Sequence, residues 1–179
     1  MNTYRLHPLT LAVFVLGLVW VIFTRQAQPV TPTVSANEIL PEVTLRALTN
    51  EPISTSTLLG RPAMLTLWAS WCPPCIAEMP LLAEMQPWLA ERGIEFVAIN
   101  QGESTTMITD YLQAHNYSFA VWSDTQAQMG RVLRSNDLPT TVFIDANGVV
   151  RLVYRGPVTA ELIRVMADVL TADSTGARS

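Results

Sequence analysis

Cys72 and Cys75 are the only cysteines of the 179-residue chain, and two prolines separate them. The pair follows an apolar segment, residues 63–69, and begins a stretch whose apolar residues have helical spacing. Two thiols at the start of a helix can close a disulfide within one turn, and the free backbone N–H groups there stabilise a thiolate. The spacing therefore predicts a redox pair in which Cys72 attacks a substrate disulfide and Cys75 resolves the mixed disulfide.

Other uses of a cysteine pair find less support in the sequence. An inert structural disulfide is one alternative. A metal site lacks further ligands, because there is no third cysteine and the chain has only two histidines. Covalent haem attachment is excluded, since Ile76 stands where that motif requires histidine. We therefore expect no metal and no cofactor besides the disulfide itself.

Charge excludes another class of protein. All 11 basic residues are arginine, and the chain also carries 15 acidic residues, for a net charge of −4. Every acidic residue lies at or after Glu38, so the region beyond the N-terminus is the more acidic part. A nucleic-acid-binding domain with this balance is not expected. Because lysine is absent, no ammonium group can assist formation of a thiolate.

The N-terminus has the composition of a membrane-directed segment. Residues 9–23 carry one polar side chain, Thr10, and a span that recruits residues 6–24 would reach across a bilayer. We expect an uncleaved anchor in residues 1–25, with a cleaved signal peptide as the alternative. The Pro- and Thr-rich residues 26–37 are expected to form a linker.

From residue 38 onward the pattern is that of a globular domain, expected to span residues 38–171 and to be followed by a flexible tail, 172–179. Short apolar runs alternate with segments of helical spacing, which predicts an α/β sheet of mixed strand direction with helices on both faces. An N-terminal strand and turn indicate a hairpin, and Asn147-Gly148 indicates a second one. The expected strands are 43–48, 63–69, 94–100, 119–122, 140–145 and 149–154; the expected helices are 72–92, 104–115, 124–134 and 159–170.

Four runs of sequence resemble one branch of a known superfamily: LWASWCPPC at 67–75, IAEMP at 76–80, VAINQGES at 97–104 and LPTTVFID at 138–145. Together they resemble the membrane-anchored, extracytoplasmic TlpA/ResA-like branch of the thioredoxin superfamily, over about residues 38–170. The resemblance implies a thioredoxin-like fold, in which a mixed central sheet is flanked by helices. It also implies an N-terminal hairpin and an inserted strand–helix unit.

The resemblance also assigns roles to residues. Cys72 would be the exposed nucleophile and Cys75 the buried resolving thiol. Glu78, one helical turn after Cys75, would be buried near the thiols and take part in their proton transfers. Pro139 would be a cis-proline facing the disulfide, and the backbone at Leu138 would pair with an extended substrate.

Three more residues complete the expected substrate-binding surface around the disulfide. Trp71 precedes the pair and is expected to face the substrate, whereas Trp68 is expected in the core. Pro73 and Pro74 fix the first turn of the helix and restrict the disulfide ring.

The expected function is a thiol-disulfide oxidoreductase that exchanges its disulfide with protein substrates. The resemblance favours a reductase, with apocytochrome c among its substrates and a membrane electron donor as partner. It also favours a single-pass protein of the bacterial inner membrane whose domain lies on the extracytoplasmic or periplasmic side. The alternatives are a thiol oxidase, a non-catalytic module for haem or metal handling, and a thiol peroxidase, whose motif context does not fit.

Overall fold

The structure is a computed structural model that describes residues 37–176. The predicted anchor or signal peptide, and the linker up to residue 36, lie outside the described residues. Within residues 37–176, no helix has the length and apolar character needed to cross a membrane.

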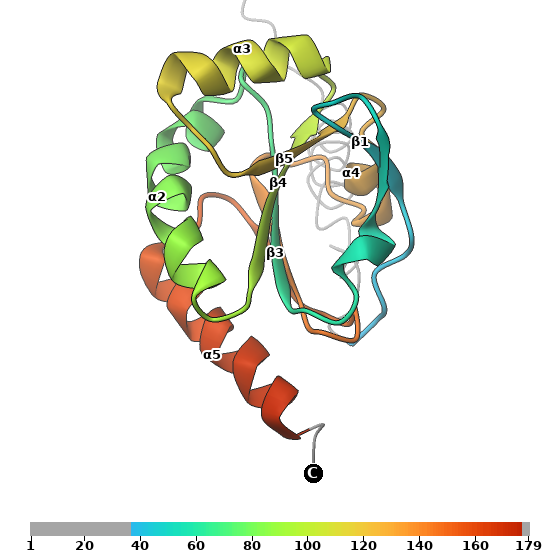
Figure 1. The fold of residues 1–179 in the computed structure, drawn as a ribbon, viewed down its shortest axis with the longest axis vertical. Coiled ribbons are helices and arrows are strands. Elements are labelled where there is room, and N and C mark those ends of the chain that lie inside the picture. The colour runs from blue at the N-terminus through green and yellow to red at the C-terminus, as the bar shows by residue number, and fades with distance from the viewer. Residues whose placement is uncertain (1–36, 177–179) are drawn as a thin grey trace, which may run out of the picture. The chain divides into compact units, whose positions relative to one another are not determined.

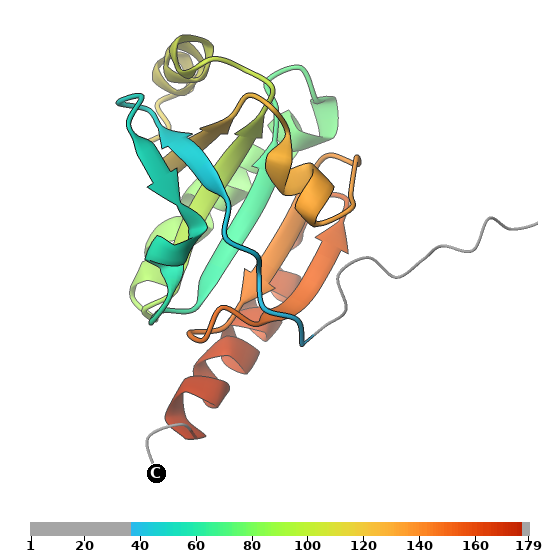
Figure 2. The same cartoon turned by 90° about the vertical axis from the view of Figure 1, so that its right-hand side faces the viewer.

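A seven-stranded sheet of mixed direction forms the centre of the domain, in the order β2-β1-β5-β4-β3-β6-β7. Figure 2 shows this sheet with the β1–β2 hairpin toward one edge and β7 at the other. β3 is parallel to β4 and antiparallel to β6, so the predicted mixture of strand directions is confirmed. The strands are β1 (Thr44–Ala47), β2 (Pro52–Ser54), β3 (Ala63–Trp68), β4 (Glu95–Gln101), β5 (Ala120–Asp124), β6 (Thr140–Ile144) and β7 (Val150–Arg155).

Helices cover both faces of the sheet. α2 and α5 lie on one side of it, α4 lies on the other, and α3 crosses its upper end in Figure 1. The helices are η1 (Thr55–Leu58, a 3-10 turn), α2 (Pro73–Ala90), α3 (Thr105–His115), α4 (Gln128–Val132) and α5 (Ala160–Gly176). This arrangement confirms the predicted thioredoxin-like fold class.

Alternation along the central strands separates two hydrophobic cores. Successive strand residues point to opposite faces, so Met64 and Trp68 of β3 pack in the core under α2 and α5, whereas Leu65 packs in the core under α4. All six residues of β3 are buried, as expected for a strand covered on both faces. Trp68 is fully buried, which confirms its predicted place in the core.

The sheet topology brings two distant segments to one edge. β3 ends at Trp68, just before the cysteine pair, and antiparallel β6 begins beside it, with Thr140 paired to Leu67. The segment that contains Leu138 and Pro139 therefore lies next to the start of α2. The shared edge is where the predicted site must form.

Three predicted boundaries were wrong. β5 continues to Asp124, and α4 begins only at Gln128, because the Asp124 carboxylate accepts hydrogen bonds from the N–H groups of Gln128 and Met129 at 2.9 and 2.8 Å. Ala127 has a left-handed backbone conformation with φ of 50°, which prevents an earlier helical turn. At the other end of the domain, α5 continues to residue 176, whereas the sequence predicted its end near Leu170.

Candidate active site

The cysteine pair occupies the N-terminus of α2. Cys72 is the N-cap residue, and Pro73 and Pro74 fill the first turn, where a missing N–H costs no helical hydrogen bond. Cys72 and Cys75 form a disulfide, with Cα atoms 5.3 Å apart. The N–H of Cys75 donates to Cys72 Sγ at 3.3 Å, so the helix terminus already directs a backbone donor at this sulfur.

Cys75 is buried as the resemblance implied, but Cys72 is more buried than expected. Cys72 is only 3% exposed and Cys75 is fully buried, so the expected exposed nucleophile is nearly covered in the disulfide form. Hydrophobic residues of the α2 core pack around both. The nearby exposed large hydrophobic side chains are Trp71, at 66%, and Ile76, at 38%, and Pro73 and Pro74 are exposed as well. Trp71 thus lies at the surface, as predicted.

The Leu138–Pro139 peptide bond is cis, as the family resemblance implied. The backbone of Pro139 is fixed by a hydrogen bond, because its carbonyl accepts from Gly156 N–H at 2.8 Å. Leu138 is half-buried and contacts both cores, so it lies at the boundary between the two faces of the sheet. This segment is where the resemblance places the partner backbone for an extended substrate.

Glu78 lies on the buried face of α2, which is defined by residues at helical spacing: Cys75, Glu78, Met79, Leu82, Met85 and Leu89. It is 4% exposed, as the resemblance implied and unlike a typical surface glutamate. Its Oε2 accepts a hydrogen bond from Val158 N–H at 2.9 Å, whereas its Oε1 has no partner. Desolvation outweighs this one hydrogen bond and raises the pKa of Glu78 from 4.5 to about 7.

A second buried carboxylate, Glu103, lies at the same edge of the sheet and received no role from the sequence. It lies two residues after the end of β4 and is 4% exposed. Its Oε2 accepts from Ser70 N–H at 2.8 Å and from Asn100 Nδ2 at 2.6 Å, and its Oε1 accepts from Ser70 Oγ. The signal in the sequence was a polar run, residues 100–103, at the end of a strand parallel to β3.

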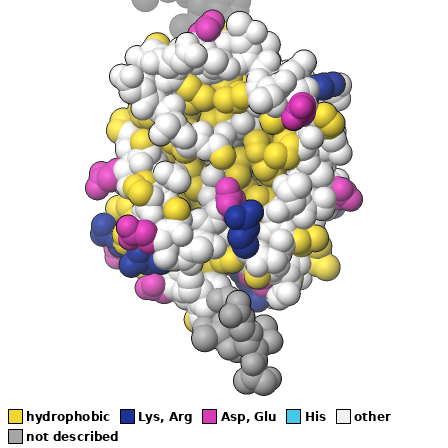
Figure 3. Space-filling model, viewed as in Figure 1, with side chains coloured by type: hydrophobic (Ala, Val, Ile, Leu, Met, Phe, Trp, Pro, Cys, Tyr) yellow, Lys and Arg dark blue, Asp and Glu magenta, His cyan; other side chains and the backbone are white. Residues whose placement is uncertain are grey.

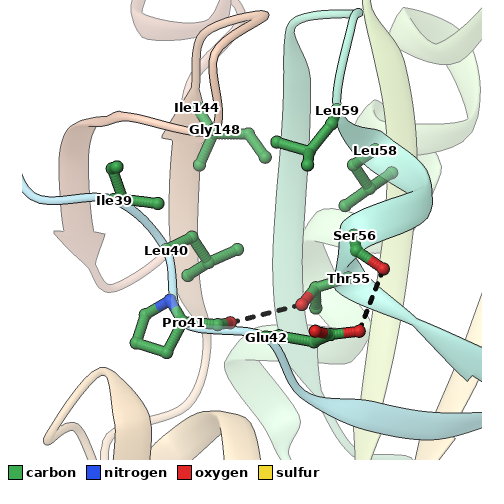
Figure 4. Close-up of a pocket in the computed structure, with 10 residues that line it drawn as sticks. All are labelled: Ile39, Leu40, Pro41, Glu42, Thr55, Ser56, Leu58, Leu59, Ile144 and Gly148. Carbon is green, nitrogen blue, oxygen red and sulfur yellow. Dashed lines mark hydrogen bonds between the residues drawn. The ribbon is translucent and has the colours of Figure 1, made fainter.

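The part of the chain that the structure describes offers no metal site, and its apolar pocket lies away from the cysteine pair. Within residues 37–176, no group of three or more His, Cys, Asp or Glu side chains is placed to hold a metal ion. An apolar pocket of about 270 Å³ lies between residues 39–42, the η1 turn and the β6–β7 connection, with Glu42 the one charged residue in its lining (Figure 4). Its wall residue Ile144 ends β6, so this pocket is at the opposite end of the strand from Pro139.

On the face drawn in Figure 3, the described residues form no large cluster of charged side chains. Apolar side chains occupy the upper middle of this face. One acidic and one basic side chain lie side by side near its centre, and the other charged side chains lie mainly around the rim. Among the described residues drawn there, no basic stripe follows the surface in the way that a nucleic-acid backbone requires.

The fold, the disulfide at the helix N-terminus and the cis-proline beside it define a thioredoxin-fold protein with a redox-active cysteine pair. The chain belongs to the AhpC/TSA family, whose sequence pattern matches residues 36–153. Over 128 residues it is 30% identical to the thiol-disulfide oxidoreductase ResA of Geobacillus kaustophilus, covering 72% of this chain and 74% of that protein. The ResA of Bacillus subtilis is 30% identical over 131 residues, with 73% of each chain covered.

A solved structure gives the same assignment. A candidate thiol:disulfide interchange protein DsbE from Chlorobium tepidum superimposes with a TM-score of 0.71 and 26% identity, covering 78% of this chain and 99% of the other. The chain is therefore a thiol-disulfide oxidoreductase of the ResA/DsbE type, and the predicted family, fold and enzyme class are confirmed.

Proposed function

We propose that the protein reduces disulfides of other proteins on the extracytoplasmic side of a bacterial inner membrane. The observation that carries the proposal is the buried carboxylate of Glu78, one helical turn from Cys75, with no cation beside it. Neither of the two ion pairs found among residues 37–176 involves Glu78; they join Arg61 to Glu95 and Arg151 to Asp145.

The reaction begins with the reduced enzyme. The Cys72 thiolate attacks one sulfur of a substrate disulfide, which forms a mixed disulfide and releases the other substrate sulfur as a thiolate that takes up a proton. Cys75 then loses its proton and attacks Cys72 Sγ, which closes the enzyme disulfide and frees the second substrate thiol. Two electrons pass from the enzyme dithiol to the substrate, and a dithiol protein returns them to the enzyme.

Glu78 is the base for the second step. Cys75 is fully buried and must become a thiolate to act, so its proton needs an acceptor inside the protein. A carboxylate with a pKa of about 7 is poised to accept and return a proton near neutral pH. Its unpartnered Oε1 is the oxygen that is free to receive it.

The same carboxylate favours the reducing direction. An enzyme is a strong oxidant when its dithiol form is stabilised as a thiolate, and a neighbouring negative charge opposes that stabilisation. With lysine absent from the chain and Glu78 outside both ion pairs of residues 37–176, the helix N-terminus is left as the main support for a thiolate. Because little stabilises the thiolate besides the helix N-terminus, and the charge of Glu78 opposes it, we expect a low reduction potential.

Substrate binding is assigned to the surface around the pair. The backbone at Leu138, before the cis peptide bond to Pro139, would pair with an extended substrate segment. The exposed Trp71 ring supplies apolar contact, and Pro73 and Pro74 shape the rim of the disulfide. Apocytochrome c is the substrate that we propose, with a membrane dithiol protein as electron donor. Residues 6–24 would anchor the enzyme, and the cysteine pair would be its sole redox group.

Two measurements on the full-length protein in detergent test the proposal. Equilibration with dithiothreitol gives the midpoint potential, which we expect near or below about −270 mV, the value of thioredoxin; a value near about −120 mV would instead identify an oxidase. The reduced Cys75→Ser variant should accumulate a mixed disulfide through Cys72 with apocytochrome c peptides whose two cysteines form a disulfide, and Cys72→Ser should not. Absence of the trapped species would refute the assignment of Cys72 as nucleophile.

A further inference from the structure

We infer that Glu103 is a positioning residue for disulfide exchange: through Ser70, its carboxylate holds the loop that places Cys72 at the N-terminus of α2. The inference rests on the proposed role of Cys72 as the nucleophile. It concerns a residue that lies far from the cysteines in the sequence and whose hydrogen bonds go to Ser70, Asn100 and Ser123.

The first step is the connection between Glu103 and the loop. Ser70 lies between β3 and α2, and it donates two hydrogen bonds to Glu103, from its backbone N–H to Oε2 at 2.8 Å and from its hydroxyl to Oε1. A bidentate contact to a carboxylate fixes both the position and the orientation of the donor residue. The loop backbone is therefore attached to the segment that follows β4.

The second step is that Glu103 is itself immobilised. Asn100 of β4 donates to Glu103 Oε2 at 2.6 Å and accepts from Glu103 N–H at 3.3 Å. Ser123 of β5 donates through its hydroxyl to the Glu103 carbonyl at 2.9 Å. Because Asn100 and Ser123 are paired strand residues of the central sheet, Glu103 is a rigid anchor rather than a mobile side chain.

The third step leads from Ser70 to the reactive sulfur. Only Trp71 separates Ser70 from Cys72, and the Cys72 N–H donates to the Ala69 carbonyl at 3.2 Å, which closes a tight turn. This turn places Cys72 Sγ where the Cys75 N–H points at it. If the turn moves, the sulfur leaves the helix terminus and a thiolate there loses its backbone donor.

Replacement of Glu103 can separate geometry from charge. Glu103→Gln removes the charge but keeps the shape: its amide oxygen can accept from Ser70 N–H and Asn100, and its amide NH₂ can donate to the Ser70 hydroxyl. Glu103→Ala removes both the charge and the anchor. If Glu103 acts through geometry, the reactivity of Cys72 will change in the alanine variant but not in the glutamine variant. If it acts through its negative charge, both variants will stabilise the Cys72 thiolate to the same extent.

The experiment measures alkylation of reduced, full-length protein by iodoacetamide between pH 5 and 10, with mass spectrometry to locate the product on Cys72. For Glu103→Ala we expect the rate at pH 7 to fall about tenfold and the profile to move to higher pH. Glu103→Gln should stay within about threefold of the wild type, as the conservative variant that preserves the anchor. Glu84→Gln, an exposed glutamate of α2, controls for loss of a charge.

Equal profiles for Glu103→Ala and the wild type would overturn the inference, as would equal shifts in the alanine and glutamine variants. Should Glu103→Ala fail to fold, Ser70→Ala replaces it, since Ser70 is half-exposed and loses only its hydroxyl bond. Ser70→Ala should then be slower than Glu103→Gln, and the reverse order refutes the inference. Alkylation needs no protein substrate, so the result is independent of whether the reductase proposal survives.

Discussion

Two buried glutamates flank the cysteine pair, and their surroundings differ. Glu78 on α2 accepts one backbone hydrogen bond and leaves Oε1 without a partner, and desolvation raises its pKa to about 7. Glu103 at the end of β4 is equally buried, at 4% exposure, but three donors from Ser70 and Asn100 point at its two oxygens. Burial alone therefore does not define the role of a carboxylate.

The difference lies in the number of donors and the mobility of the proton. A carboxylate that is desolvated and short of donors binds a proton readily and can pass it on near neutral pH. A carboxylate surrounded by donors is stabilised by the hydrogen bonds that it accepts. Its contribution to the protein is to fix the positions of the donor groups. We therefore expect variants of Glu78 to change proton-linked steps, and variants of Glu103 to change loop position and stability.

The largest expected effect separates the two glutamates kinetically. Glu78→Gln should slow the attack of Cys75 on a Cys72 mixed disulfide about 100-fold at pH 7, because the base for Cys75 is lost. The step can be followed as release of the yellow thionitrobenzoate anion from labelled Cys72 in a stopped-flow instrument. The wild-type rate should rise with pH around 7, and that rise should be absent in the variant. An equal slowing by Glu103→Gln would erase the distinction.

The next effect concerns stability. Glu103→Ala should lower the free energy of unfolding by about 3 kcal/mol, because it leaves buried donors of Asn100 and Ser70 without an acceptor. Glu103→Gln should cost about 1 kcal/mol or less, since it retains an acceptor. Urea unfolding of the oxidised protein measures both, and the loss should be the same at pH 5 and pH 8. A loss confined to one pH would contradict a purely geometric role.

A third effect appears in the pH dependence of stability. Between pH 4.5 and about 7 the unfolded chain ionises Glu78 while the folded protein keeps the proton, so stability falls as pH rises. We expect a loss of about 2 kcal/mol above pH 7, a value reduced for partial solvent screening. Unfolding curves of Glu78→Gln should lack this fall, and those of Glu103→Gln should keep it. A flat wild-type curve would mean that Glu78 ionises in the folded protein as it does in water.

The smallest expected effect is that of replacing Trp71, on the surface beside the cysteine pair. Trp71→Ala should change the free energy of unfolding by less than about 0.5 kcal/mol, because the ring is 66% exposed. Its KM for a protein substrate should rise about fivefold through lost apolar contact. Steady-state reduction of a disulfide-containing protein, compared with that of a small disulfide, measures the difference. A large loss of stability would instead assign the ring to the core.

The two glutamates also show how far the sequence could be interpreted. The position of Glu78 on the same helix face as Cys75 was predictable because three residues are about one helical turn, but its burial near the thiols was expected only from the family resemblance. Glu103 acts on Ser70 from 33 residues away, through a contact that exists only once β3 and β4 lie side by side. Residues 97–104 helped to identify the family, but no pattern in that run specifies which backbone N–H the carboxylate binds.

The wrong predictions have the same origin in tertiary structure. The α4 boundary depends on how Asp124 and Ala127 turn the chain, and side-chain capping by Asp124 is not visible in hydrophobic spacing. The burial of Cys72 depends on neighbours that pack around it from other elements. In contrast, the strands, the Asn147-Gly148 hairpin and the active-site helix followed from local patterns, because their signals lie within the segment itself.

The unequal burial of the two sulfurs has a kinetic consequence. With Cys75 fully buried and Cys72 at 3% exposure, an incoming thiolate can approach the closed ring only at Cys72. In the proposed reaction the same atom is the nucleophile toward the substrate and the electrophile toward the electron donor, so the two partners would use one surface in turn. No ternary complex can form, and steady-state plots at several donor concentrations should give the parallel lines of a ping-pong mechanism.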